Sequence, residues 1–118
     1  MTDWNNKEEV LRAIRSRRGY LLKYASDELK NDKEVVLAAV NNWGSALQYA
    51  SKELRGDKEV VMAAVRNNGD ALEFASDEFK GDKEVVLAAV KEDGDALEYA
   101  DDSLKNDPEF MKEVEQYL

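Results

Sequence analysis

The sequence predicts an all-α protein, a short α-solenoid of two-helix repeats, and three observations carry this prediction. First, a nine-residue stretch recurs every 25 residues, at 32–40, 57–65 and 82–90. Second, the phrase Gly-x-Ala-Leu-x-(Tyr/Phe)-Ala recurs in step with it. Third, each nine-residue stretch begins at an aspartate and carries a pair of alanines just before its last residue. A fixed period of this length is typical of stacked-repeat proteins, in which each unit contacts only its neighbours.

The period divides the chain into four units and a capping helix, which together form a single repeat domain over residues 1–118. The predicted units are 6–31, 32–56, 57–81 and 82–106, and the C-terminal capping helix is 107–118. With two helices in each unit we expect about nine helices. The first unit is atypical, because Arg12 replaces an alanine and one extra residue precedes Gly19. The capping helix is only half a repeat. Departures at both ends are expected of caps, which need one apolar and one polar face.

The first helix of each unit is predicted to begin at an N-cap side chain, which accepts hydrogen bonds from the first-turn amides. Asn6 holds this position in the first unit, and four aspartates hold it in the others: Asp32, Asp57, Asp82 and Asp107. Pro108 follows the last aspartate, and proline is favoured at the first helical position. The body at 35–40 is apolar nearly all round, which predicts a helix covered on several sides.

The second helix of each unit follows a glycine, for which we expect a left-handed C-cap. These glycines are Gly19, Gly44, Gly69 and Gly94. A capping box, such as Ser45 with Gln48, is predicted to open the second helix. The helix ends at residues that tolerate a left-handed conformation: Asn31, Gly56, Gly81 and Asn106. Its aromatic position is interpreted as core, because one unit has phenylalanine there and so does not need the tyrosine hydroxyl. The residues at this position are Tyr24, Tyr49, Phe74 and Tyr99.

This alternation of Asp-Lys-Glu-Val-Val-Leu-Ala-Ala-Val with Asn-Gly-x-Ala-Leu-x-Tyr-Ala-Ser resembles an uncharacterised helical-repeat family, a domain of unknown function. The resemblance covers residues 6–118, and only the first unit departs from the pattern at the positions named above. It implies arrays of the kind found in bacterial and protist proteins, some of which are regarded as secreted effectors. It carries over no reaction, cofactor or set of binding residues.

Composition and motifs argue against an enzyme. The chain has no cysteine and no histidine, which excludes thiolate nucleophiles, Cys/His zinc sites and the usual general base near neutral pH. An EF-hand fails because placing Gly94 at loop position six puts Lys91 and Ala89 where ligands belong. The acidic residues recur in every unit as caps, whereas a catalytic pair has no reason to recur. We therefore expect no catalytic residue, no metal and no cofactor.

The three positions before each glycine vary between units, and they give the candidate protein-binding edge. Its predicted members are Arg15, Arg17, Arg18, Asn42, Trp43, Arg66 and Asn68. Trp43 replaces polar residues of the other units, and a large aromatic at an edge often anchors a partner. The alternative is that Trp43 folds over a neighbouring turn. The arginines predict a site for an acidic peptide or phosphate, with a solvated cap as the alternative.

We therefore expect a non-enzymatic protein-binding or scaffolding module for an unknown protein or peptide. The alternative is a self-associating protein, because residues 1–25 carry six basic and three acidic side chains in a chain of net charge −9. A basic N-terminal end would then meet the acidic C-terminal end of the next copy. We expect a monomer that self-associates weakly at most.

The acidic balance argues against nucleic acid as a partner. The N-terminus lacks the features of a secretory signal, and apolar runs of about six residues are far below the roughly 20 that span a membrane. A cytoplasmic location follows, or delivery into a host cytosol for an effector.

Overall fold

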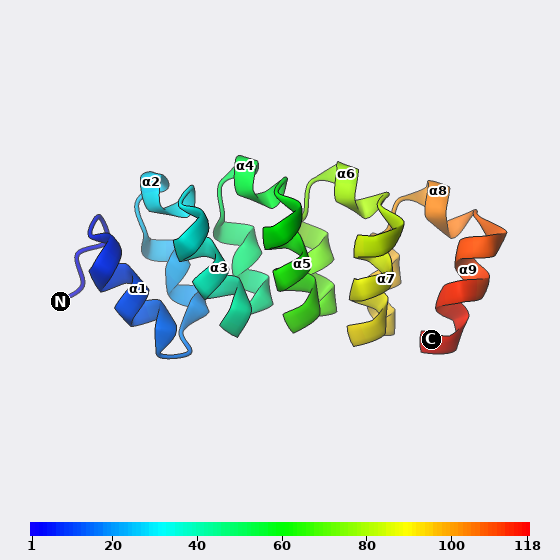
Figure 1. Cartoon of the computed structure of the whole chain (residues 1–118), viewed down its shortest axis with the longest axis horizontal. Coiled ribbons are helices and arrows are strands. Elements are labelled where there is room, and N and C mark those ends of the chain that lie inside the picture. The colour runs from blue at the N-terminus through cyan, green and yellow to red at the C-terminus, as the bar shows by residue number, and fades with distance from the viewer.

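The computed structural model describes residues 1–118, and it is a straight row of helices without a strand, 52 Å long and 23 by 17 Å across (Figure 1). One helix of each repeat stands in the front layer of Figure 1, and we call the surface of this layer the α-face. Its members are α1 (Lys7–Arg15), α3 (Lys33–Asn42), α5 (Lys58–Asn67), α7 (Lys83–Glu92) and α9 (Pro108–Val114). The predicted all-α solenoid is confirmed.

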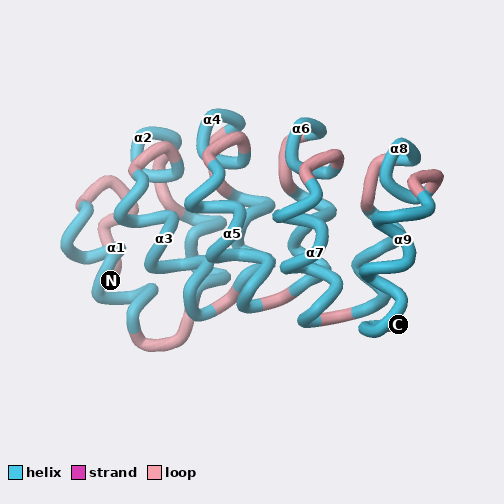
Figure 2. The backbone as a smooth tube through the Cα atoms, turned by 45° about the vertical axis from the view of Figure 1, so that its right-hand side comes forward, coloured by secondary structure: helices cyan, strands magenta, loops and turns pink.

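A second layer of 3-10 helices lies behind the first, and we call its surface the η-face. It contains η1 (Gly19–Tyr24), η2 (Gly44–Tyr49), η3 (Gly69–Phe74) and η4 (Gly94–Tyr99), and η5 (Glu115–Tyr117) ends the chain. Short α-helices line one long edge of the array (Figure 2). They are α2 (Asp27–Lys30), α4 (Lys52–Arg55), α6 (Asp77–Lys80) and α8 (Asp102–Lys105). None of these helices is long and apolar enough to cross a membrane.

The second helix of each unit was predicted as one piece, and this is wrong, because it is a 3-10 helix followed by a separate short α-helix. The break falls at the residue that opens the short helix, which is a serine in the first three units and Asp101 in the fourth. Ser51 has an extended backbone, φ −60° and ψ 158°, and its Oγ accepts from the Leu54 amide at 3.2 Å. Its own amide donates to the Lys30 carbonyl of the preceding repeat at 2.9 Å. The break therefore ties neighbouring repeats together.

The predicted aspartate caps are present, and each also contacts the preceding repeat. Oδ1 of Asp32 accepts from the amides of Glu34 and Val35 at 3.0 and 3.2 Å. Oδ2 of the same carboxylate lies 2.9 Å from Nζ of Lys7. The lysine hydrogen bond and the two amides hold the pKa of Asp32 below its ordinary value against the opposing effect of burial. The same pairing recurs at Lys33–Asp57, Lys58–Asp82 and Lys83–Asp107.

The predicted left-handed glycine caps are wrong, because no glycine has a positive φ. Gly44 and Gly69 are needed for close approach: an added Cβ at Gly44 would overlap the carbonyl oxygen of Ala64, and one at Gly69 would overlap that of Ala89. Nor does a left-handed residue end the second helix, since Asn31 and Gly56 have φ of −105° and −102°. Repeats pack so closely that the glycine backbone of one lies on the α-helix of the next.

The capping box predicted for Ser45 and Gln48 is also not formed. In the third and fourth repeats the residue before the glycine caps the 3-10 helix: Oδ1 of Asn68 accepts from the Asp70 amide at 3.0 Å, and Asp93 does the same for Asp95 at 2.9 Å. No side chain caps the first two 3-10 helices. In a 3-10 helix the backbone hydrogen bonds join residues three apart, whereas in an α-helix they join residues four apart. The spacing of an α-helical capping box therefore does not fit it.

The extra residue of the first unit is absorbed by the turn between α1 and η1. Arg17 has φ 64°, the one positive φ among the non-glycine residues. The inserted residue turns the chain in the left-handed region, and Gly19 still reaches its place against the next repeat, where its amide donates to Asn42.

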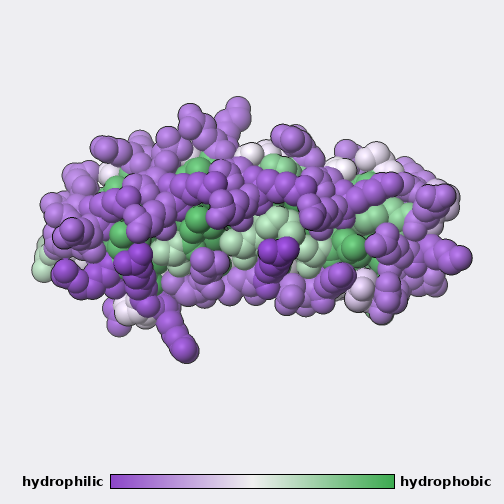
Figure 3. Space-filling view, viewed as in Figure 1, coloured by the Kyte–Doolittle hydropathy of each residue, from purple (hydrophilic) through white to green (hydrophobic).

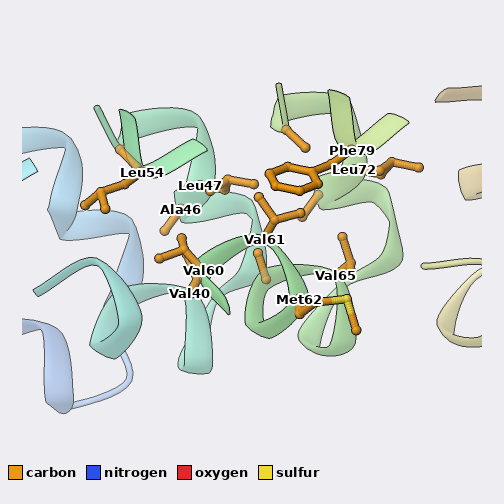
Figure 4. Close-up of a cluster of buried hydrophobic side chains, with 14 of the residues drawn as sticks. Val40, Ala46, Leu47, Leu54, Val60, Val61, Met62, Val65, Leu72 and Phe79 are labelled. Carbon is orange, nitrogen blue, oxygen red and sulfur yellow. The ribbon is translucent and has the colours of Figure 1, made fainter. Parts of the chain in front are cut away.

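The buried residues form one continuous core from Val10 to Val114 between the two layers. In the central repeats Leu47 from η2, Val61 from α5 and Leu72 from η3 are all fully buried (Figure 4). The interpretation of the aromatic position as core is corrected to a partly covered position. Tyr24 is 54% exposed, and Tyr49, Phe74 and Tyr99 are half-buried against the core. The second layer is one helix thick and leaves these rings at its outer surface.

Replacing Gly56 by asparagine should stabilise the protein. Ser51 donates its hydroxyl to Oδ1 of Asn31 at 2.6 Å, but one repeat later Gly56 stands in place of Asn31 and Oγ of Ser76 is buried without a partner. Gly56 has the backbone conformation of Asn31, so Gly56→Asn fits without strain. We expect a gain of about 0.5–1.5 kcal/mol in the free energy of unfolding, measured by urea denaturation. An equal gain in Gly56→Asn, Ser76→Ala would contradict the role of the hydrogen bond.

Candidate interaction surfaces

The structure divides the predicted binding edge among three places. Arg15 and Arg66 lie on the α-face, in the last turns of α1 and α5. Arg17, Arg18 and Trp43 lie in the turns that lead from the first layer to the second. Asn42 and Asn68 bond to the neighbouring repeat. The edge is therefore not one continuous site.

The asparagines of this edge hold the stack together. Oδ1 of Asn42 accepts from the Gly19 amide at 2.7 Å, and its Nδ2 donates to the carbonyls of Ile14 and Ala38, both at 3.0 Å. Asn67 repeats the first contact one unit later, accepting from the Gly44 amide at 2.6 Å. Sequence reasoning missed Asn67, although the recurrence of asparagine at this position is the signal of a stacking role.

Replacing Asn42 by alanine should destabilise the fold. The substitution leaves the Gly19 amide and the Ile14 carbonyl without their side-chain partner in a half-buried place, which we expect to cost about 1–3 kcal/mol in the free energy of unfolding. Asn41→Ala is the matched control, since its side chain is exposed and makes no hydrogen bond. Equal urea midpoints for the two variants would refute the stacking role.

A shallow groove crosses the α-face from α3 over α5 to α7. Apolar side chains form its floor: Leu37, Met62, Ala63, Leu87 and Ala88. Figure 3 shows a hydrophobic band along the long axis of this face, with hydrophilic residues on both sides. Met62 and Arg66 line the groove on both sides of α5, which makes it continuous over three repeats. Sequence reasoning missed the floor, because these residues belong to helices expected to be covered.

The two rims of this groove differ in charge. On the rim formed by the helix N-termini each lysine is neutralised: Nζ of Lys58, for example, lies 2.6 Å from a carboxylate oxygen of Glu84 and 3.2 Å from one of Asp82. On the opposite rim Arg66 is exposed and has no ion pair, and Lys91 contacts only the ring of Tyr117, 5.6 Å from its centroid. The cations free to meet a ligand therefore stand along one rim, where the exposed Glu92 also lines the groove.

Trp43 lies in an aromatic cluster on the η-face. Its ring lies edge-on to that of Tyr20, with centroids 6.3 Å apart, and at the same distance from Tyr49 in a tilted arrangement. Trp43 is half-buried against the core, whereas Tyr20 is 49% exposed. The tryptophan thus packs over the turn of the preceding repeat and still forms part of an exposed aromatic surface. A further pair, Trp4 and Tyr24, lies in the first repeat at 5.5 Å.

Charge on the η-face changes sign along the array. Three positions are compared in each repeat, counted from the glycine that opens the 3-10 helix: one residue before it, one residue after it and four residues after it. They are Arg18, Tyr20 and Lys23 in the first repeat, Trp43, Ser45 and Gln48 in the second, Asn68, Asp70 and Glu73 in the third, and Asp93, Asp95 and Glu98 in the fourth. The face is therefore basic and aromatic at one end and acidic at the other.

Two of these carboxylates meet between the third and fourth repeats. Between the second and third repeats Nδ2 of Asn68 donates to Oγ of Ser45 at 3.0 Å, but one repeat later Asp93 faces Asp70. Oδ1 of Asp70 is buried without a partner. Burial, and the charges of Asp93, Asp95 and Glu98, raise the pKa of Asp70. No group of three or more carboxylates is placed to hold a metal ion.

Asp70→Ser should stabilise the protein at neutral pH, because the new hydroxyl can donate a hydrogen bond to the carboxylate of Asp93. The equivalent residues one repeat earlier, Ser45 and Asn68, are also joined by a hydrogen bond. We expect a gain of about 1–3 kcal/mol in the free energy of unfolding. Because the pKa of Asp70 is raised in the folded state, protonated Asp70 contributes to stability at pH values below its ordinary pKa. This contribution is lost as the pH rises through the raised pKa. The gain should therefore shrink at about pH 4.

The matched control for Asp70→Ser is Asp95→Ser, which removes one charge from the same cluster at an exposed position. Urea unfolding of both variants near neutral pH and at about pH 4 gives the comparison. A pH-independent gain, or an equal gain in the control, would show that the buried oxygen of Asp70 is not the cause.

Comparison with known proteins gives one family. A family model described as a domain of unknown function (DUF4116) matches the chain four times, at residues 6–55, 32–80, 57–103 and 82–114. The first three matches each span about two repeats, the fourth spans the last repeat and most of the capping helix, and together they cover nearly the whole chain. No curated protein matches the chain, and no solved structure does.

Proposed function

Since the chain belongs to the DUF4116 family, whose description states no activity, we propose from its surfaces that it is a non-enzymatic module that binds a protein or peptide. The groove on the α-face carries this proposal. Its floor is apolar over three repeats and lies open between polar rims. Solenoids commonly bind partners along such extended faces.

The groove favours a partner with apolar side chains and acidic groups. Leu37 and Leu87 are half-exposed on the floor, although both lie on helices that bury most of their apolar residues. Arg66 and Lys91 stand beside that floor without ion pairs. A segment that lays apolar residues along the floor and carboxylates along this rim would cover both, as amphipathic helices do in hydrophobic grooves.

The test is capture of partners from a cell extract with quantitative mass spectrometry. The groove variant is Arg66→Glu, Lys91→Glu, and its control is Lys52→Glu, Lys112→Glu, which has the same change in net charge on exposed residues outside the groove. We expect a partner held by wild type and by the control and lost from the groove variant. Circular dichroism first establishes that all three are equally helical.

A third variant, Trp43→Ala, Arg17→Glu, Arg18→Glu, tests the sequence-predicted edge separately from the groove. Loss of the partner from this variant alone would move the binding site to the aromatic cluster. Retention of every captured protein by the groove variant would contradict the proposal.

A further inference from the structure

The η-face carries a second feature, which the groove does not use. At the three positions compared above, the first repeat has two positive charges and the second has none, whereas the third has two negative charges and the fourth has three. These groups are not neutralised within the chain. The ion pairs of the structure all lie among Lys7, Lys33, Lys58, Lys83, Arg15 and their acidic partners.

The groups at the two ends of this face are accessible to a partner. Arg18 and Lys23 are exposed at one end, and Asp95 and Glu98 are exposed at the other. Nζ of Lys23 contacts only the ring of the adjacent Tyr24, 5.8 Å from its centroid. Beside the basic end lie the exposed rings of Tyr20 and Tyr24, which add apolar area to the same surface. One chain therefore carries both halves of a complementary pair on one face.

We propose that two copies of the chain associate through their η-faces in antiparallel orientation. Arg18 and Lys23 of each copy then face Asp95 and Glu98 of the other, and the aromatic surface around Tyr20 of each copy is covered by the third and fourth repeats of its partner. A twofold axis perpendicular to the long axis makes both contacts identical, so the assembly closes as a dimer.

The dimensions of the face suit such an interface. The array is 52 Å long and at most 23 Å across, which leaves room for the roughly 800 Å² per partner that a standard interface buries. The net charge of −9 opposes association at very low salt. At about 0.1 M salt charges more than about 10 Å apart are largely screened, whereas charges in contact are screened less. Association should therefore be strongest at moderate salt and weaken at about 1 M.

The arrangement differs from head-to-tail stacking of the helix ends. Within the array, the lysine that follows each N-cap forms an ion pair with the N-cap aspartate of the next repeat. At the C-terminal end Pro108 stands in place of this lysine, and at the N-terminal end Asn6 stands in place of the aspartate. The ends therefore cannot continue the series of Lys–Asp pairs into another copy. Side-by-side pairing of the η-faces needs neither group.

The test is a charge exchange measured by light scattering at about 0.1 M salt. One variant is Arg18→Glu, Lys23→Glu, and the other is Asp95→Lys, Glu98→Lys. Each alone places like charges at both contacts of a homodimer, and we expect self-association at least about tenfold weaker than in wild type. An equimolar mixture restores opposite charges at both contacts and should form a one-to-one dimer. Circular dichroism and urea unfolding check the fold of both variants.

Wild type should saturate at twice the chain mass of 13.4 kDa as concentration rises. A mass that stays at one chain, or a mixture of the two variants that does not associate, would overturn the proposal. Growth without saturation would overturn it in favour of open head-to-tail assembly. The groove variant Arg66→Glu, Lys91→Glu should dimerise as wild type does, which separates this interface from the proposed peptide-binding groove.

Discussion

Gly69→Ala is expected to lower the free energy of unfolding by about 3 kcal/mol or more. An added Cβ would overlap the backbone carbonyl oxygen of Ala89, and this carbonyl belongs to α7 of the next repeat. A flexible side chain could move aside, but a helix backbone packed on both sides cannot. The two repeats would have to separate locally, which exposes the core between them. Urea unfolding followed by circular dichroism measures the loss.

The matched control is Gly56→Ala, at a glycine outside this contact. An added Cβ at Gly56 meets its nearest atom, the Glu53 carbonyl oxygen, at 3.4 Å, and φ is −102°, which alanine adopts without strain. This substitution should be neutral or gain up to about 1 kcal/mol, because it reduces the freedom of the unfolded chain. A loss of similar size in both variants would contradict the account of close repeat packing.

Leu72→Ala should cost about 3–5 kcal/mol in the free energy of unfolding. Leu72 lies on η3 and is fully buried between the two layers in the middle of the array. Its removal leaves a cavity that the helices on both sides can close only by moving. A domain is usually stable by about 5–15 kcal/mol, so this loss is a large part of the total.

The control for Leu72→Ala is Leu97→Ala, the same change one repeat later. Leu97 is only half-buried, because η4 is the last helix of its layer before the terminal cap. We expect a loss well below that of Leu72→Ala, since water can reach the space that the side chain leaves. Equal losses would mean that the ends of the array are as tightly packed as its centre.

The repeat period and the caps allowed the architecture to be predicted from the sequence. Asp32 and its equivalents start the helices of the first layer, and Pro108 marks the start of the last. These signals act within a few residues along the chain, where local rules are strong. Because the body of each of these helices is apolar nearly all round, it needs a packed neighbour on each side, and this requirement predicted the stacked array.

Features that depend on contact between repeats could not be predicted in the same way. Gly69 looked like a left-handed cap because that is the commonest use of glycine after a helix. Its actual role is to let the chain lie against Ala89 of the next repeat, which no local pattern reveals. The break at Ser51 has the same origin, because its amide bonds to Lys30 of the preceding repeat.

The candidate site was predicted only in part. Variation between units drew attention to Arg66, which lines the groove, but it also included Asn42, which bonds to the preceding repeat. Whether Arg17, Arg18 and Trp43 contact a partner stays a prediction. The groove floor could not be found from the sequence, because Leu37 and Leu87 lie on helices whose residues all look like core.

The most direct test of the proposed function places a photoreactive amino acid at Ala63, on the floor of the groove, and cross-links the chain in a cell extract. The control position is Glu78 on α6, which is exposed and lies outside the groove. We predict a specific adduct from position 63 that disappears in the Arg66→Glu, Lys91→Glu background and is absent from position 78. Adducts of the same proteins from both positions, unaffected by the charge reversal, would contradict a partner-binding groove on the α-face.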